Sequence, residues 1–533
     1  MNLERMTAGA RPLSTATLAT HAARVAVPQY DRAALAPAIV HLGVGGFHRA
    51  HQAVYLDELA RRGVTTWGEV GVGLHHRKMK EALDPQDCLY TVAERGAEGD
   101  AARVVGVMGR YLFAPDEPGA VLDALADSRT RLVTLTVTMA GYHIDPVTGD
   151  LKAEDLAVQA DLGRSAAPTT IFGYLCEALE HRRAAGHPPF TILSCDNMQD
   201  NGGAARTALL SFARLRDREL GDWIEDTVAF PSSMVDRITP ETTLEGQAWV
   251  ARRFGVGDRW PVVTEPFAQW IVEDTFCNGR PPLDEVGVQF VRDVAPYLRM
   301  KTRLLNASHS VMGYVGYLLG YRFTDQVMGD PLIRAYITGL MDDEVTLLLP
   351  NVPGIDLPAY KRTLLQRFAN SEIRDELARL CARGSTKMPT FLLPSVAEAL
   401  QHGAPHDLLT LAVAVWFRYL RGVDCDGRPI DIQDARKERL CELALRGGHD
   451  PRLLLGERDI FGDLGRNAAF VASLERAARA FEQDGLRATI AAAMRRASRG
   501  CEAPPATTLI SSVLARPDPA RRSREEERPL APV

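Results

Sequence analysis

Three polar residues in an apolar segment, Lys301, Asn306 and His309, have types and spacing that suit acid–base chemistry. At about 100° per helical residue, Asn306 falls about 140° and His309 about 80° around the axis from Lys301, so all three can project to one side. A lysine that loses its proton on burial is a general base, and an asparagine and a histidine can orient an alkoxide or carbonyl oxygen. The alternative is a surface lysine beside two core polar residues that bond to the backbone.

A glycine-rich segment near the N-terminus is the second candidate site. The apolar run 38–42 precedes the residues GVGGFHRAHQ at 43–52, and a helical pattern through Leu56 and Leu59 follows. A strand, a glycine turn and a helix in this order form a dinucleotide-binding unit, in which backbone amides at the helix start approach the pyrophosphate. His48 stands where the G-x-G-x-x-G fingerprint has its third glycine, so a glycine turn without a ligand is the alternative.

Together these two segments resemble the polyol-specific long-chain dehydrogenases of the mannitol dehydrogenase family. Residues 43–52 are similar to the family's N-terminal signature, and Lys301, Asn306 and His309 match its K-x4-N-x2-H catalytic helix. Other blocks are similar too, and the resemblance covers residues 40 to 474 approximately; the blocks are 71–74, 135–138, 236–240 and 264–270.

The resemblance implies a catalytic role for four side chains. Lys301 would be the base in oxidation and the acid in ketose reduction, Asn197 and Asn306 would bind the reacting oxygen, and His309 would orient it. Asn197 follows an apolar strand, where an open α/β sheet forms its ligand crevice. On local sequence alone, a helix-capping role is the favoured interpretation of the pair of Asp196 and Asn197.

The resemblance also implies binding residues. Asp236 is similar to the family's substrate-binding carboxylate, and Lys387 lies in a segment, 384–389, that is similar to a substrate-contacting loop, with Arg379 as a further candidate. A solvent-exposed lysine in a glycine turn is the alternative for Lys387. The cofactor contacts would come from the glycine segment and from the end of the second strand: Gly43, Gly45, Gly46, Phe47, His48, Arg49 and His75.

Two positions depart from the family's pattern. Many relatives carry a glutamate three residues before the lysine, where this chain has Leu298, and relatives tend to read T-V-T-E where this chain has Met139 in the fourth place. Both changes remove a carboxylate that could relay protons or tune the lysine's pKa. We expect altered pH behaviour or substrate choice rather than an inactive protein.

The cofactor expected from the resemblance is NAD, with NADP left open. An NAD site often carries Asp or Glu about 20 residues beyond the glycines to bond the ribose hydroxyls, whereas basic residues accommodate a 2′-phosphate. Here Leu74 is followed by His75, His76, Arg77 and Lys78, without a carboxylate. The alternative is a solvated loop that touches no cofactor.

Composition excludes several classes of partner. A formal charge of −6 on 533 residues gives no reason to expect nucleic acid, and no apolar run reaches the roughly 18 residues of a membrane helix. The eight cysteines form no C-x-x-C pair, so neither a zinc site nor a disulfide framework is expected and a reducing cytoplasm fits best. We expect a monomer whose partner is a small polyol or ketose, and no metal site.

The element pattern predicts an α/β fold with two domains. Strand-like runs at 39–42, 68–74, 132–139 and 190–195 alternate with helical patterns, which argues for a Rossmann-like, mostly parallel sheet in residues 1–295. Residues 296–514 are almost entirely helical in pattern and would form a domain that carries the catalytic helix. Residues 515–533 are charged and proline-rich, so we expect them to be disordered.

The expected function is that of a metal-independent polyol dehydrogenase. By the resemblance, the leading reaction is NAD-dependent oxidation of D-mannitol to D-fructose and its reverse. The same chemistry on arabinitol, sorbitol or a hexuronate, as in a fructuronate reductase, is the nearest alternative. A more distant alternative is a nucleotide-binding regulator that has kept the scaffold and lost turnover.

Overall fold

A five-stranded parallel sheet forms the centre of the first domain. The structure, a computed structural model, describes residues 9–145, 148–164 and 166–500. All neighbouring strands of this sheet are parallel. Their order is β6-β3-β2-β7-β8, with bounds Met108–Phe113, Trp67–Gly73, Ala36–Leu42, Leu132–Leu135 and Thr191–Ser194. This is the strand order of a Rossmann-type half, so the predicted fold of this domain is confirmed.

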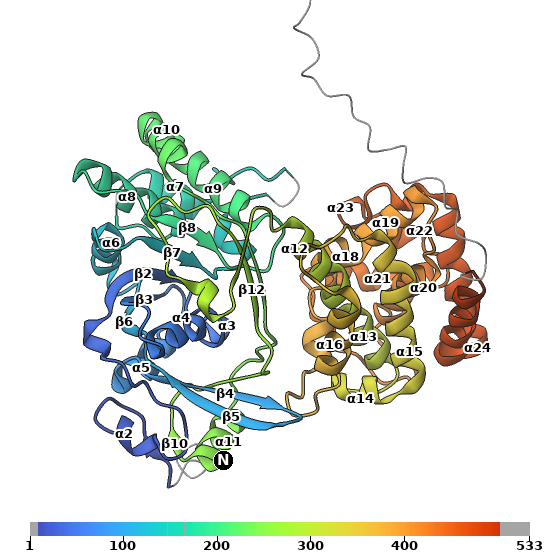
Figure 1. Ribbon diagram of the computed structural model, residues 1–533. Helices are drawn as coiled ribbons and strands as arrows, with labels where there is room; N and C mark the ends of the chain where they lie inside the picture. The colour runs from blue at the N-terminus through green and yellow to red at the C-terminus, as the bar shows by residue number, and fades with distance from the viewer. Residues whose placement is uncertain (1–8, 146–147, 165, 501–533) are drawn as a thin grey trace, which may run out of the picture.

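Both faces of the sheet are covered, as its nearly continuous apolar strands require. Successive residues of a strand point to opposite faces, so Ile39 packs on one face while Val40 and Leu42 pack on the other. The face of Val40 is covered by α6 (Pro118–Ala126), α8 (Ile171–Ala184), α9 (Asn201–Arg216) and α10 (Arg218–Thr227). The face of Ile39 packs on α4 (Gln52–Arg61) and on strands outside the main sheet (Figure 1).

Each of the four predicted strands lies in this sheet, as β2, β3, β7 and β8. One prediction was too long, because the strand expected over 132–139 ends at Leu135. Beyond it, the backbone N–H groups of Val137 and Thr138 donate to the carboxylate of Asp196 instead of to a neighbouring strand. Because these N–H groups bond to a side chain and not to a strand, the segment after Leu135 leaves the sheet.

Two small sheets extend the first domain toward the second. One has the order β13-β12-β9, with bounds Gln289–Val291, Gln269–Glu273 and Ser233–Asp236. In the other, the hairpin of β4 (Tyr90–Gly96) and β5 (Gly99–Val105) pairs with β11 (Val262–Thr264). The hairpin reaches toward the helical domain (Figure 1), and Arg95 of β4 forms an ion pair with Glu372 across the boundary, at 2.5 Å.

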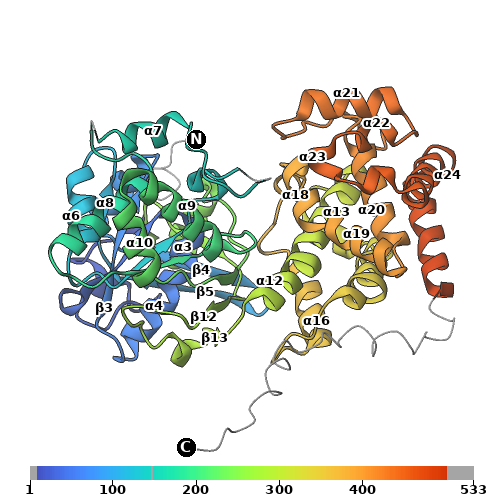
Figure 2. The same cartoon turned by 90° about the horizontal axis from the view of Figure 1, so that it is seen from above.

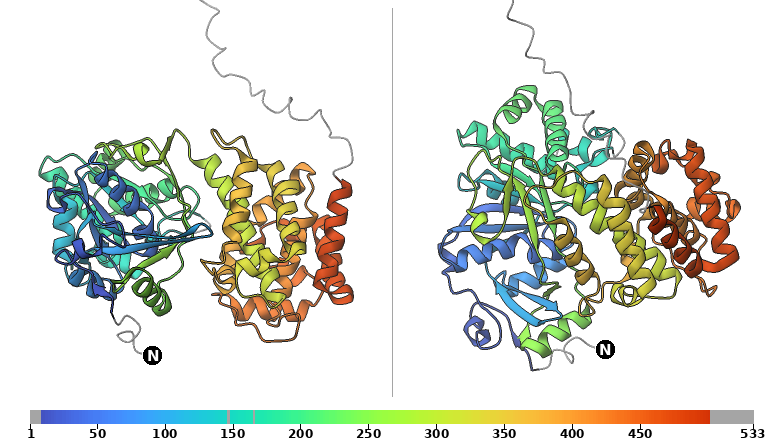
Figure 3. Two further views of the ribbon diagram at one scale, coloured as in Figure 1. Left: turned by 60° about the horizontal axis from the view of Figure 1, so that its bottom comes forward. Right: turned by 45° about the vertical axis from the view of Figure 1, so that its right-hand side comes forward.

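The second domain is a helical bundle built around α13 (Ala307–Leu318). This helix is buried on nearly every side, because α14 (Thr324–Gly329), α15 (Pro331–Gly339), α17 (Leu377–Cys381), α18 (Gly384–Phe391) and α20 (Asp407–Tyr419) all pack against it. Helix α24 (Ala468–Gly500), which is interrupted at Gly485, lies on the outer side (Figures 2 and 3). The prediction of a helical second domain is confirmed.

The two domains meet at α12 (Ala295–Lys301), which follows β13 and leads into the bundle (Figure 1). Within the described ranges, none of the helices combines the length and apolarity needed to cross a bilayer. The cysteines in the same ranges are all free. The predicted disordered segment 515–533 lies outside the described residues.

Candidate active site

The glycine turn sits where the sheet reverses its strand order. Strand β2 has β3 on one side and β7 on the other, and the crevice at such a point is where open parallel sheets bind ligands. Gly43, directly after β2, has φ +97°, and a Cβ there would collide with the carbonyl oxygen of Thr136. The Thr136 hydroxyl donates to the Gly43 carbonyl at 2.8 Å. The turn is therefore fixed against the end of β7, and only glycine fits it.

The next two glycines leave open space in front of a helix start. An added Cβ on Gly45 or Gly46 would have its nearest neighbour 3.8 Å away. Helix α3 (Gly46–Ala50) begins here, and its N-cap residue, Gly45, has no side chain to cap the first N–H groups. Unobstructed backbone N–H groups at a helix start suit a pyrophosphate, so these residues fit the dinucleotide that the sequence predicts.

His48 and Arg49, two predicted cofactor residues, have their side chains in the domain interior. The ring of His48 stacks on His41 of β2 at 3.5 Å and bonds to Glu69 of β3 at 2.9 Å. Burial lowers the pKa of His48 to about 3 and raises that of Glu69 to about 7, which favours neutral groups. Arg49 bonds to the carbonyls of Gly45 and Trp260. Both side chains therefore pack in the domain interior behind the glycine turn and stabilise its shape.

Phe47 and His75, the other predicted cofactor residues, are at least partly accessible. The ring of Phe47 stacks on His51 at 4.9 Å. His75 is exposed just beyond the carboxyl end of β3, where a Rossmann-type unit meets the adenosine ribose. Two residues further on, Arg77 forms an ion pair with Asp116 at 2.5 Å, which offsets part of the positive charge of the segment.

Lys301, the predicted base, is buried at the end of α12. Its Nζ donates to Oδ1 of Asn197 and to the carbonyl of Val235 in β9, both at 2.7 Å. Burial lowers the pKa of Lys301 to about 8, the Asp236 carboxylate opposes that change, and the Arg367 guanidinium adds to it. A lysine with this pKa can exchange a proton near neutrality.

A π-helical turn, Thr302–Asn306, separates the lysine from the rest of its predicted helix. The sequence predicts a regular α-helix from Lys301 to His309, so the ideal angles do not apply beyond this turn. Such turns are frequent at functional sites. Oδ1 of Asn306 and Nε2 of His309 are buried and find no hydrogen-bond partner among the described residues. Buried polar atoms of this kind are suited to a polar ligand.

Asn197 follows β8 and is exposed. Its neighbour Asp196 accepts the N–H groups of Val137 and Thr138 at 3.1 and 2.8 Å, and the Tyr142 hydroxyl at 2.8 Å. Thr138 has φ +62°, an unusual value for a β-branched residue. Asp196 therefore holds the segment after β7 in a strained form beside Asn197.

Asp236, the predicted substrate-binding carboxylate, is held by an arginine that the sequence did not reveal. Arg367 of α16 (Leu357–Phe368) donates to both oxygens of Asp236, at 2.8 and 2.9 Å, and to both oxygens of Glu265, at 3.0 and 2.8 Å. Burial opposes ionisation of Asp236, but the Arg367 charge, with Lys301 and His309, lowers its pKa on balance. Nothing in the local pattern around Arg367 separates it from a surface helix residue.

Lys387 and Arg379 come together at the junction of α17 and α18. Nζ of Lys387 donates to the carbonyls of Arg379 and Leu380 at 2.9 and 3.0 Å, and burial lowers its pKa to about 8, with Arg379 and Arg383 adding to the shift. The Arg379 guanidinium forms an ion pair with Asp375. Helices α17 and α18 both pack on α13, the helix that contains His309, and the charges of Asp375 and Arg379 act on the pKa of that histidine.

The two departures from the family's pattern occupy different surroundings. Leu298 is buried and packs in the core of the helical domain. Met139 is 40% exposed and begins the short helical turn Met139–Tyr142, next to the strained Thr138. Of the two positions where the resemblance implies a carboxylate, 298 is therefore buried and 139 is exposed to solvent.

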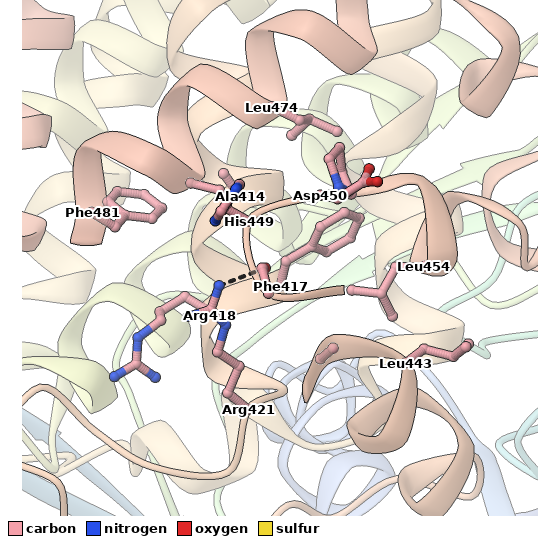
Figure 4. A pocket seen from close by; sticks show the side chains of 14 residues that line it. Ala414, Phe417, Arg418, Arg421, Leu443, His449, Asp450, Leu454, Leu474 and Phe481 are labelled. Atoms are coloured by element: carbon pink, nitrogen blue, oxygen red, sulfur yellow. Dashed lines mark hydrogen bonds between the residues drawn. The ribbon is translucent and has the colours of Figure 1, made fainter. Parts of the chain in front are cut away.

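Other features of the structure do not compete with this site. Within the described ranges, no three His, Cys, Asp or Glu side chains are grouped so that they could hold a metal ion. A cavity of about 20 Å³, room for about one water, lies in the helical domain and is lined by Phe417, Arg418, His449 and others (Figure 4). It contains none of the predicted site residues.

Two family models match the chain. One, described as Mannitol dehydrogenase Rossmann domain, matches residues 37–285, and the other, described as Mannitol dehydrogenase C-terminal domain, matches residues 293–482. Mannitol 2-dehydrogenase of Phaeosphaeria nodorum is 47% identical over 474 residues, 88% of this chain and 83% of the relative. Mannitol 2-dehydrogenase of Aspergillus fumigatus is 45% identical over 478 residues, 88% of this chain and 95% of the relative.

Two solved structures are similar over nearly the whole fold. Mannitol 2-dehydrogenase of Pseudomonas fluorescens, in a ternary complex with NAD and D-mannitol, aligns with a TM-score of 0.84 at 42% identity, over 92% of this chain and 100% of the other. A D-sorbitol dehydrogenase in substrate-free form aligns with a TM-score of 0.81 at 35% identity, over 90% of this chain and 100% of the other. The resemblance inferred from the glycine segment and the lysine helix is confirmed: this chain belongs to the mannitol dehydrogenase family.

Proposed function

We propose that this protein oxidises D-mannitol to D-fructose with NAD and catalyses the reverse reduction. The observation that carries the proposal is the buried amine of Lys301, held between Asn197 and strand β9 with a pKa lowered to about 8. The relatives named mannitol 2-dehydrogenase, and the ternary complex of one of them with NAD and D-mannitol, support the same substrate and cofactor.

The chemistry follows from the groups around Lys301. In oxidation, the neutral amine takes the proton of the reacting hydroxyl, and in ketose reduction the ammonium returns it. The amide groups of Asn197 and Asn306 stabilise the alkoxide as its charge develops, while His309 orients the same oxygen through its buried Nε2. NAD, when bound, supplies the acceptor for the hydride that leaves the carbinol carbon.

Substrate binding is proposed for Asp236, Lys387 and Arg379. A carboxylate and two cations offer hydrogen-bond partners for the hydroxyl groups that do not react. The nucleotide would lie over Gly43, Gly45, Gly46 and Phe47, with its ribose toward His75. His48 and Arg49 would act through the shape of the turn, since their side chains are buried beneath it.

D-sorbitol is the second candidate substrate, because the D-sorbitol dehydrogenase shares the fold at 35% identity. The two polyols have the same number of hydroxyl groups and differ only in configuration. The cofactor alternative is NADP, which the basic residues from His75 to Lys78 leave open. We also propose that the protein is a monomer and that it is cytoplasmic. The cytoplasmic location is supported by the cysteines of the described ranges, which are all free.

A substrate panel tests the proposal. The purified protein would be assayed with mannitol, sorbitol, arabinitol, fructose and fructuronate, each with NAD and NADP, by the absorbance of the reduced nicotinamide. We expect the highest kcat/KM for mannitol and fructose with NAD. A higher kcat/KM for sorbitol than for mannitol would make sorbitol the proposed substrate. Binding of NADH without turnover of any polyol would favour a nucleotide-binding regulator.

A further inference from the structure

Arg367 joins the two domains at the candidate active site. It belongs to α16 of the helical domain, whereas its partners Asp236 and Glu265 belong to the first domain. All three residues are buried, with exposed fractions of 7%, 4% and 2%. Four hydrogen bonds of 2.8 to 3.0 Å connect the guanidinium to the two carboxylates.

The geometry of these bonds fixes Asp236 in one orientation. A guanidinium presents a rigid planar fork, so two parallel bonds to one carboxylate define both its position and its plane. Arg367 is itself held by Glu265 and by the ring of Phe267, which lies 4.0 Å from the guanidinium carbon. Neither side of the Asp236 pair is free to rotate.

The same part of the chain contacts one further site residue, and its partner Asp236 lies one residue away from a partner of the base. Phe368, the last residue of α16, packs its ring on His309 at 4.7 Å. Lys301 bonds to the carbonyl of Val235, the residue next to Asp236 in β9. The end of α16 therefore contacts the carboxylate and the imidazole, and strand β9, which carries that carboxylate, also binds the base.

We propose that Arg367 is a positioning residue for the polyol reaction: it sets Asp236 toward the substrate and fixes the angle between the two domains at the site. The inference rests on the proposed function, because Asp236 is assigned to the substrate there. Replacement of the arginine would leave a buried carboxylate with one partner fewer, and removal of a single member of a buried charged pair is strongly unfavourable.

The charges around the base give the proposal a second readout. Lys301 is influenced by the charges of Asp236 and Arg367, and His51 lies near it. His309 lies near the same two charged groups, and burial lowers the pKa values of both histidines to about 3. The histidines are therefore neutral near pH 8. Arg367→Met removes a cation that lowers the pKa of Lys301 and keeps Asp236, which raises it, so the apparent pKa for oxidation should rise.

The test compares Arg367→Lys, Arg367→Met and Glu265→Gln with Arg95→Met. Arg95 is a matched control, because it also pairs across the domain boundary, with Glu372, but does not touch Asp236. For each variant, kcat and KM for mannitol, the pH profile of kcat/KM, the NADH affinity by fluorescence and the melting temperature would be measured. Lysine keeps the charge and loses the fork, so it separates position from charge.

We expect Arg367→Lys to lower kcat/KM by roughly tenfold to a hundredfold, the size of effect that a small misplacement of a site group produces. The apparent pKa in its pH profile should be the same as in the wild type, and its NADH affinity should stay within about twofold of the wild type. The control variant Arg95→Met should resemble the wild type in all four measurements. Glu265→Gln, which leaves the Asp236 pair in place, should lose less activity than Arg367→Lys. If Arg367→Met does not fold, the lysine and glutamine variants decide.

Wild-type kcat/KM in Arg367→Lys would overturn the inference, as would equal losses in Arg367→Lys and Arg95→Met, which would reduce Arg367 to a domain contact. A loss in Arg367→Lys that is matched by weaker NADH binding would also overturn it. These results differ from a failure of the proposed function, in which the wild type itself would turn over no polyol.

Discussion

Nζ of Lys301 lies 2.7 Å from Oδ1 of Asn197, although the two residues are 104 positions apart in the chain. Asn197 follows strand β8 of the parallel sheet, and Lys301 ends the first helix of the second domain. The bond uses the amide oxygen of Asn197, so its NH₂ group is the part that can donate to a substrate oxygen. One residue from each domain thus shares the reacting centre.

Lys301→Ala should abolish turnover and leave cofactor binding nearly unchanged. General acid–base assistance typically contributes on the order of 10²- to 10⁴-fold, so the loss should fall in kcat. Steady-state kinetics and NADH fluorescence titration measure the two effects. Lys361→Ala is the control, since that lysine pairs with Asp342 elsewhere in the helical domain. Activity above about a tenth of the wild type would exclude Lys301 as the base.

The pH dependence should have opposite signs in the two directions. Burial lowers the pKa of Lys301 to about 8, and the neutral amine is the base for oxidation. kcat/KM for mannitol should therefore rise as the pH passes through about 8 and level off above it, while kcat/KM for fructose should fall over the same range. Profiles at constant ionic strength test this. Parallel changes in both directions would contradict the assignment.

Chelators should leave the rate unchanged. The oxygen-stabilising groups proposed here are a lysine, two asparagines and a histidine, and the described residues contain no grouped metal ligands. The measurement is the oxidation rate before and after prolonged dialysis against a chelator. A loss of rate that zinc restores would overturn the proposed mechanism.

Gly43→Ala should weaken nucleotide binding. A Cβ at this position meets the Thr136 carbonyl, and the backbone φ of +97° is one that alanine rarely adopts. Gly109→Ala is a control in the same sheet, because nothing lies within 4 Å of the added Cβ. NADH titration should show a weaker complex for the first variant only. Equal affinities in the two variants would show that the turn does not cradle the nucleotide.

His75→Asp, or His76→Asp, should widen the preference for NAD over NADP. A carboxylate at the end of β3 repels a 2′-phosphate, and specificity is a difference between two affinities. The wild type, without that carboxylate, should prefer NAD and retain measurable NADP activity. The ratio of kcat/KM values for the two cofactors is the measurement. Equal losses with both cofactors would mean that the segment does not contact the adenosine ribose.

Local pattern was sufficient to predict the fold class and the position of the glycine turn. The apolar runs of β2, β3, β7 and β8, and the glycines after β2, are signals within a few neighbouring residues. The bond between Lys301 and Asn197 depends on how the two domains meet, and only the resemblance implied that the two residues act on the same oxygen. The proposed substrate-binding roles of Lys387 and Arg379 likewise rest on the resemblance.

What local pattern missed has a physical reason in each case. The π-helical turn after Lys301 is set by tertiary packing, because residues 302–305 have no glycine or proline to mark it. Arg367 looks like any charged residue of an amphipathic helix until its partners in the other domain are placed. The sequence shows His48 in place of the third glycine of the fingerprint. In the structure its ring is accommodated by stacking on His41.

The bonds between Arg367, Asp236 and Glu265 have a consequence for protein engineering. Chimeras that combine the Rossmann half of one family member with the helical half of another cut through this cluster, because its cation and its anions are encoded on opposite sides of the junction. A chimera would inherit a working substrate site only if both parents supply matching members of the cluster. The two halves are separate in architecture, but they are not interchangeable modules.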